Sequence, residues 1–121
     1  MPENTQKVKT VTRYYTLKPE DLVCLEAAAR REKKTEKQAV NLALTGVEDG
    51  QVGFNAGAVF KDHIRVVLIL PEPVMEALER DAKAAGNHPS DIFRKKIRDY
   101  VNRDKLRREE SKMAVPGNIH V

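Results

Sequence analysis

The stretch Thr16-Leu17-Lys18-Pro19-Glu20-Asp21-Leu22 has a counterpart later in the chain, Ile69-Leu70-Pro71-Glu72-Pro73-Val74-Met75. In both stretches an extended run ends at a proline, which suits the first turn of a helix because it has no N–H to donate. Aligning Leu17 with Leu70 sets an offset of 53 residues (70 − 17). The same offset aligns, without a gap, Leu22 with Met75, Leu25 with Leu78, Ala29 with Ala82, Val40 with Phe93 and Leu44 with Ile97. The shared offset predicts two copies of one supersecondary unit.

Each copy begins with residues that favour a β-strand. Residues 10–17 are rich in Thr, Val and Tyr, and residues 64–70 are almost all branched aliphatic. The sequence after each proline has the helical period, with apolar residues at i, i+3 and i+7, as in Leu22, Leu25 and Ala29. Each unit is therefore predicted to start as a strand followed by an amphipathic helix.

A second helix is predicted in each copy. In copy one, Thr35 with Gln38 is typical of a capping box at a helix start. In copy two, Gly86 is a good left-handed end for the first helix, and Pro89 suits the first turn of the next. The complete unit is then strand, helix, turn, helix.

A lone strand leaves both of its edges unpaired, so we expect the two strands to pair antiparallel and the four helices to share one core. The predicted fold is mainly α with a two-stranded antiparallel β-ribbon. The glycine-rich segment between the copies is expected to be a linker. The layout is a loose N-terminus at 1–9, unit one at 10–45, the linker at 46–62, unit two at 63–102 and a C-terminal tail at 103–121. The final helix can extend into that tail as far as Pro116.

The composition limits the classes of protein to consider. The chain has 121 residues with 22 Lys and Arg against 18 Asp and Glu, and a net charge of +4 permits a polyanionic partner without demanding one. The longest apolar run, 66–70, is too short to span a bilayer, and the N-terminal sequence has no secretory pattern. A single cysteine cannot form an internal disulfide or a cysteine-based zinc site, which fits a cytoplasmic setting.

Catalytic chemistry has little support in the sequence. His63, His88 and His120 are scattered and have no carboxylate at a suggestive spacing. Cys24 has no histidine beside it and is expected to be a small packing residue. We therefore expect a protein that is not an enzyme and that uses no cofactor and no metal.

The order of strand, Leu-x-Pro-Glu-x-Leu turn and two helices resembles the ribbon-helix-helix superfamily of Arc, MetJ and CopG type. The resemblance covers residues 10–45 and 63–101 and rests on the order and spacing of elements, twice over, rather than on a specific motif. Two units in one chain resemble the tandem form found among plasmid conjugation accessory proteins and plasmid regulators. The resemblance implies an intramolecular pseudodimer whose ribbon enters the DNA major groove. The alternative is that each unit pairs with a unit of another chain.

The outward side of the ribbon is the predicted base-reading surface. Because side chains alternate along a strand, Leu17, Tyr15 and Arg13 are expected to face the core. An arginine there needs a partner, and a one-residue slip would turn Arg13 and Tyr15 outward instead; we prefer the unslipped register. The resemblance implies that the outward residues contact bases, and these are Thr12, Tyr14, Thr16, Arg65, Val67 and Ile69.

The start of each second helix is the predicted phosphate contact, because free N–H groups and the positive end of the helix dipole favour an anion. The residues in copy one are Lys33, Lys34, Thr35 and Lys37, and those in copy two are Asn87, His88 and Ser90. Pro89 removes one N–H, so copy two is expected to hold phosphate less well.

The leading hypothesis is sequence-specific binding of double-stranded DNA. The protein would be a transcriptional repressor or would organise plasmid or mobile-element DNA, as relaxosome proteins do. Copies could associate on adjacent DNA sites through the linker or the tail. The alternative hypothesis is an antitoxin-like or other protein-interaction module, which would use the C-terminal tail and the apolar outward face of the second strand.

Overall fold

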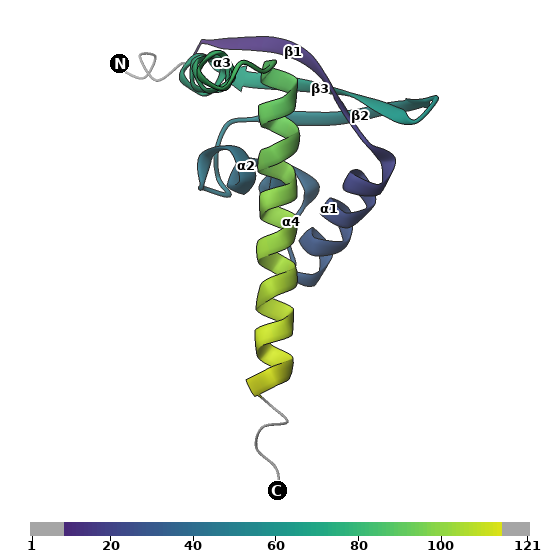
Figure 1. Ribbon diagram of the computed structural model, residues 1–121. Coiled ribbons are helices and arrows are strands. Elements are labelled where there is room, and N and C mark those ends of the chain that lie inside the picture. Colours follow the sequence, from purple (N-terminus) through teal and green to yellow (C-terminus); the bar gives the residue numbers. More distant parts are fainter. Residues whose placement is uncertain (1–8, 115–121) are drawn as a thin grey trace, which may run out of the picture.

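The computed structural model describes residues 9–114, and it describes side chains for residues 9–110. Three strands form one antiparallel sheet in the order β1-β3-β2, accompanied by four helices (Figure 1). Most of the predicted N-terminal segment, residues 115–121 of the predicted tail and His120 lie outside the described residues. The elements are β1 (Thr10–Leu17), α1 (Pro19–Arg31), α2 (Glu36–Thr45), β2 (Gly53–Phe60), β3 (His63–Pro71), α3 (Glu72–Ala85) and α4 (Pro89–Ala114).

The predicted fold class, a two-stranded ribbon with tandem units, is wrong, because the segment expected to be a linker supplies a third strand. β2 pairs antiparallel with β3, with Gly53 opposite Ile69 and Phe60 opposite His63. The sequence GFNAGAVF gave a weak strand signal, since four of its eight residues are Gly or Ala, which are depleted in strands. The sheet is therefore three-stranded, and the fold is mixed α and β.

The two strands of the repeats do lie side by side in the sheet. β1 pairs antiparallel with β3 within one chain, and Tyr14 lies opposite Val67. Tyr14 is 66% exposed whereas Tyr15 is 7% exposed, which confirms the unslipped orientation of β1. Arg13 lies on the inward side of the strand, where its guanidinium donates to Glu79 of α3 at 3.4 Å. This ion pair supplies the partner that an arginine at that position needs.

One face of the sheet is covered by the helices, and one is left open (Figure 1). Side chains from β1 and β3 alternate into a single core with residues of α1, α2, α3 and α4. Burying each large aliphatic side chain of this kind contributes roughly 1.5–3 kcal/mol. The largest fully buried residues include Leu17, Leu68 and Leu70 from the sheet and Phe93 and Ile97 from α4.

The helix ends follow local sequence signals. The capping box of Thr35 and Gln38 is present, which confirms that prediction. α3 ends at Gly86 in the left-handed conformation with φ +70°, and α4 begins at Pro89, both as predicted. α4 continues to Ala114, so the first part of the predicted tail is helical and extends beyond the rest of the molecule (Figure 1).

Cys24 departs from expectation, because its side chain is exposed on α1 rather than packed in the core. Within residues 9–114, no helix combines the length and the apolar character needed to cross a membrane.

Candidate functional site

All six residues predicted to face outward lie on the open face of the sheet. Thr12, Tyr14, Arg65 and Ile69 are exposed, while Thr16 and Val67 are half-buried. The third strand widens this face, because Asn55 lies beside Val67 in the register. The face therefore combines hydroxyl groups, one guanidinium and apolar side chains on a regular backbone.

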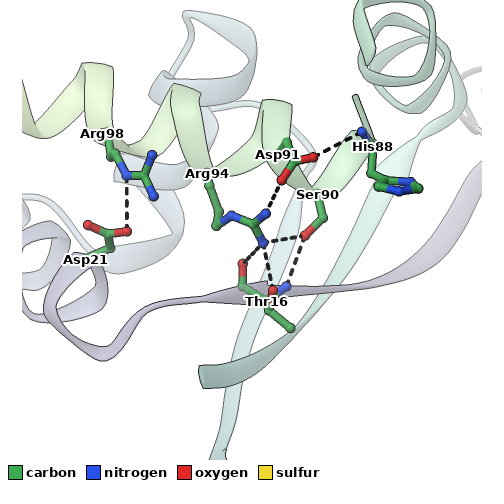
Figure 2. A network of polar contacts seen from close by, with 7 residues as sticks. All are labelled: Thr16, Asp21, His88, Ser90, Asp91, Arg94 and Arg98. Atoms are coloured by element: carbon green, nitrogen blue, oxygen red, sulfur yellow. Dashed lines mark hydrogen bonds and ion pairs between the residues drawn. The ribbon is translucent and has the colours of Figure 1, made fainter. Parts of the chain in front are cut away.

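The end of β1 at Thr16 is joined to the first turns of α4, as Figure 2 shows. The backbone N–H of Thr16 donates to Ser90 Oγ at 3.3 Å. Arg94 Nη1 donates to Thr16 Oγ1 at 2.8 Å, to the Thr16 carbonyl at 3.4 Å and to Ser90 Oγ at 3.1 Å. The side chains of α4 thus satisfy backbone groups on the free edge of β1, and the start of α4 is fixed at a corner of the open face. We call Thr16, Ser90, Asp91 and Arg94 the Thr16 corner.

The start of α4 is partly neutralised by its own carboxylate. The His88 N–H donates to Asp91 Oδ2 at 3.1 Å, and Asp91 also forms an ion pair with Arg94. The pKa of Asp91 is lowered, first by the hydrogen bond from the His88 backbone and further by the Arg94 guanidinium. Pro89 has no N–H, and the Asp91 and Ile92 N–H groups donate to the His88 carbonyl. The Ser90 backbone N–H is therefore the first-turn donor left without a hydrogen bond among the described residues.

The residues of copy one that were predicted to contact phosphate lie away from the open face. They are Lys33, Lys34, Thr35 and Lys37. Beside it in the α1–α2 turn, Glu32 accepts from Tyr100 and Arg107 at 2.9 Å each, so this turn packs against the middle of α4. Tyr100 is eleven residues beyond Pro89, about 16 Å along a helix that rises 1.5 Å per residue. Only Asn87, His88 and Ser90 of the predicted phosphate residues therefore belong to the helix end that meets the open face (Figure 1).

Ion pairs hold α4 against α1. Asp104, which is 3% exposed, accepts from Arg31 at 3.0 Å and from Arg108 at 3.3 Å. Burial by itself raises the pKa of Asp104, but the net pKa is lowered, because the hydrogen bond and charge of Arg31 and further hydrogen bonds, including that from Arg108, together outweigh burial. Nearer the sheet, Arg98 pairs with Asp21 at 3.4 Å (Figure 2).

Sequence reasoning did not predict the structural role of Arg94. Asn41 lies 53 residues earlier (94 − 41), at the equivalent position of copy one, and the structure gives it a similar role. Asn41 is fully buried; its side chain accepts from the Val52 N–H at 2.9 Å and donates to the Val52 carbonyl at 3.0 Å. Equivalent positions in the two repeats thus each hold an extended segment by its backbone.

Arg65 is the cation that the open face leaves free to bind a ligand. Among residues 9–110 no ion pair or hydrogen bond engages its guanidinium. Two other arginines of this region are engaged, Arg13 on the inward side of β1 with Glu79 and Arg94 at the start of α4 with Asp91. A free guanidinium on an exposed strand suits bidentate hydrogen bonding to phosphate or to a guanine edge.

Within the described part of the chain, no three or more His, Cys, Asp or Glu side chains lie close enough together to hold a metal ion. In comparisons with known proteins, no family model, no curated protein and no solved structure matches this chain.

Proposed function

We propose that the protein binds double-stranded DNA through the open face of its sheet. The observation that carries the proposal is the placement of that face: an uncovered set of strands bearing Thr12, Tyr14 and Arg65 meets the start of α4 at the Thr16 corner. Strands can read bases in the major groove while a helix start holds the adjoining phosphate. The sequence resemblance to ribbon-helix-helix proteins is a second support.

Two strands of the sheet, β1 and β3, carry all six outward residues, and a pair of antiparallel strands fits the major groove. Neighbouring strands lie about 4.8 Å apart, so the axes of this pair are separated by about 5 Å. The major groove of B-DNA is about 12 Å wide. In this proposal Arg65 bonds a phosphate or a guanine, Thr12 and Tyr14 supply hydroxyl contacts, and Ile69 contacts thymine methyl groups.

Sequence-specific recognition, action as a repressor or as a plasmid DNA-organising protein, and a cytoplasmic location remain parts of the proposal. Sequence-specific recognition is tested by selecting bound duplexes from a pool with a randomised 20-bp centre. Enrichment of one sequence supports specific recognition. Recovery of an unchanged pool would leave only non-specific binding.

Fluorescence anisotropy with a labelled 30-bp duplex tests the binding itself. If about four phosphates are contacted, raising NaCl from 50 to 200 mM lowers the affinity roughly 100-fold. Arg65→Gln is expected to weaken binding about tenfold, whereas Arg80→Gln, which removes one exposed charge on α3, leaves it within about twofold. Absence of binding at 50 mM NaCl would refute the proposal.

A second candidate is an antitoxin-like or other protein-interaction module. It is favoured by the apolar side chains of the outer face and of the β2–β3 hairpin, since Tyr14 is 66% exposed, Phe60 71% and Ile69 44%. A protein partner that binds there would compete with duplex DNA. A chain that binds no DNA but whose Tyr14→Ser variant loses a protein partner would favour this candidate.

A further inference from the structure

The hairpin end of the open face is hollowed into a pocket of about 400 Å³. This volume lies within the range of roughly 300–1,000 Å³ that is usual for small-molecule sites. The hollow adjoins the Thr16 corner, because Thr16 forms part of its wall. Its other lining residues are Gly57, Ala58, Phe60, His63, Arg65 and Val67.

A β-bulge gives the hollow its small-residue side. Between Ala56 and Val59 the strand β2 has two residues, Gly57 and Ala58, where β3 has only Arg65. At Gly57 an added Cβ would lie 3.1 Å from the Arg65 carbonyl oxygen, so a larger residue would crowd the strand. Bulges often re-aim side chains near functional sites. Here the bulge and its small residues leave space beside the Arg65 side chain.

The chemistry of the hollow combines an aromatic surface with positive charge. The Phe60 ring is 71% exposed, and the Lys61 amine lies 5.7 Å from the ring centroid. Arg65 has no ion-pair partner among the described residues, and His63 is exposed beside Asp62 at 3.6 Å. A ligand that fits these groups has a flat ring to stack on Phe60 and an anion for Arg65. A nucleotide has both.

We propose that this hollow receives one unpaired nucleotide of the bound DNA, with its base stacked on Phe60 and its phosphate bonded to Arg65. The inference rests on the proposed DNA binding and adds a substrate class, duplex DNA that contains or adjoins an unpaired base. Aromatic side chains stack on any base, and each such contact is worth roughly 1–3 kcal/mol by alanine substitution. The hollow would then favour DNA with an unpaired base whatever the identity of that base.

Three labelled duplexes of the same flanking sequence test this inference at 100 mM NaCl. One is fully paired, one carries a single unpaired adenine, and one carries an abasic residue in place of that adenine, which keeps the flexible backbone and removes the base. We expect the unpaired adenine to increase affinity about tenfold over the paired duplex. The abasic duplex is expected to bind within about twofold of the paired one.

Phe60→Ala is expected to abolish the preference for the unpaired base while leaving the affinity for the paired duplex within about twofold. Phe60→Tyr keeps the preference, and Val23→Ala, which trims another exposed apolar residue on α1, leaves it unchanged. In the wild-type protein, NMR should show the Phe60 ring protons moving upfield with the adenine duplex, through the ring current of the stacked base.

The outcomes separate the two proposals. If the paired duplex binds through Arg65 but the unpaired adenine adds nothing, or adds equally in Phe60→Ala, the nucleotide site is overturned and the DNA-binding proposal stands. If none of the three duplexes binds, even at 50 mM NaCl, the proposed function itself is overturned, and the nucleotide site with it.

Discussion

The two repeats use equivalent positions to hold different strands. In copy two, Arg94 of α4 bonds the backbone of Thr16 on β1. In copy one, Asn41 of α2 bonds both backbone groups of Val52, just before β2. Each repeat has a polar side chain that bonds a backbone at the same position of its second helix, but β2 occupies the place that symmetry would give to β3.

This difference explains why the two helix starts have different surroundings. α4 begins beside a free strand edge, so its first turn lies at the border of the open face. The corresponding edge of β3 is occupied by β2, and the turn before α2 packs against Tyr100 and Arg107 in the middle of α4. The two repeats therefore share the polar contact made by the second helix, but the surfaces around the two helix starts differ.

The largest expected effect is a loss of stability when the Asn41 clamp, the pair of hydrogen bonds between Asn41 and the Val52 backbone, is removed. Asn41→Ala would leave both backbone groups of buried Val52 without partners, and each unsatisfied group costs about 1–3 kcal/mol. We expect a loss of about 3 kcal/mol in the free energy of unfolding, measured with urea, and faster amide exchange in β2. Arg94→Ala, at a partly exposed site, should lose about 1 kcal/mol. The exposed Asn102→Ala is the control. Equal losses at Asn41 and Arg94 would contradict the comparison.

The two helix starts are expected to differ in DNA binding. Ser90→Ala removes the hydroxyl that joins α4 to Thr16 and should weaken duplex binding about fivefold, the equivalent of one hydrogen bond. Thr35→Ala removes a cap and should reduce the free energy of unfolding by about 1 kcal/mol while duplex affinity stays within about twofold. Anisotropy and urea unfolding on both variants measure this difference. A fivefold loss of affinity in Thr35→Ala would show that copy one also contacts the duplex.

Copy one also contains a carboxyl pair that has no equivalent in copy two, where Pro89 replaces Glu36. The hydrogen bond with Glu26, helped by burial, raises the pKa of Glu36 from 4.5 to about 7. A folded-state pKa above the unfolded one gives stability that is complete below pH 4.5 and is lost as the pH rises through about 7. After allowance for solvent screening, the free energy of unfolding should fall by about 1 kcal/mol between pH 5 and pH 8.

Urea unfolding of the wild type and of Glu36→Gln at these two pH values checks this prediction. The variant should lose most of the pH dependence, and the exposed Glu76→Gln should keep it. An unchanged slope in Glu36→Gln would mean that another group sets the pH dependence.

The smallest expected effect concerns the ring that packs beneath the open face. The Tyr15 hydroxyl is buried without a hydrogen-bond partner among the described residues, and burial raises the pKa of Tyr15. Tyr15→Phe keeps the contact with Phe93, whose ring centroid is 5.7 Å away, and removes an unsatisfied donor. The free energy of unfolding should stay the same or rise by up to about 1 kcal/mol. A loss above 1 kcal/mol would reveal a partner for the hydroxyl.

The sequence allowed strong prediction where its periodicity was clear. The alternation of side chains along residues 10–17, counted back from Leu17, gave the orientation of Tyr14 and Tyr15, and the capping box at Thr35 gave the start of α2. The strand β2 could not be predicted, because its place comes from the unpaired edge of β3 and from the Asn41 clamp rather than from its own propensity. The Thr16 corner was missed for the same reason, since its contacts join residues more than 70 positions apart.

The most direct test of the proposed DNA-binding surface is a map of backbone amide shifts when a 20-bp duplex is added at 50 mM NaCl. We predict that the largest changes occur in β1 at Thr12–Thr16, in β3 at Arg65–Ile69 and at the start of α4 at His88–Asp91, with residues 33–37 unaffected. Changes centred on residues 33–37, or no changes at all, would contradict the assignment of the open face as the DNA-binding surface.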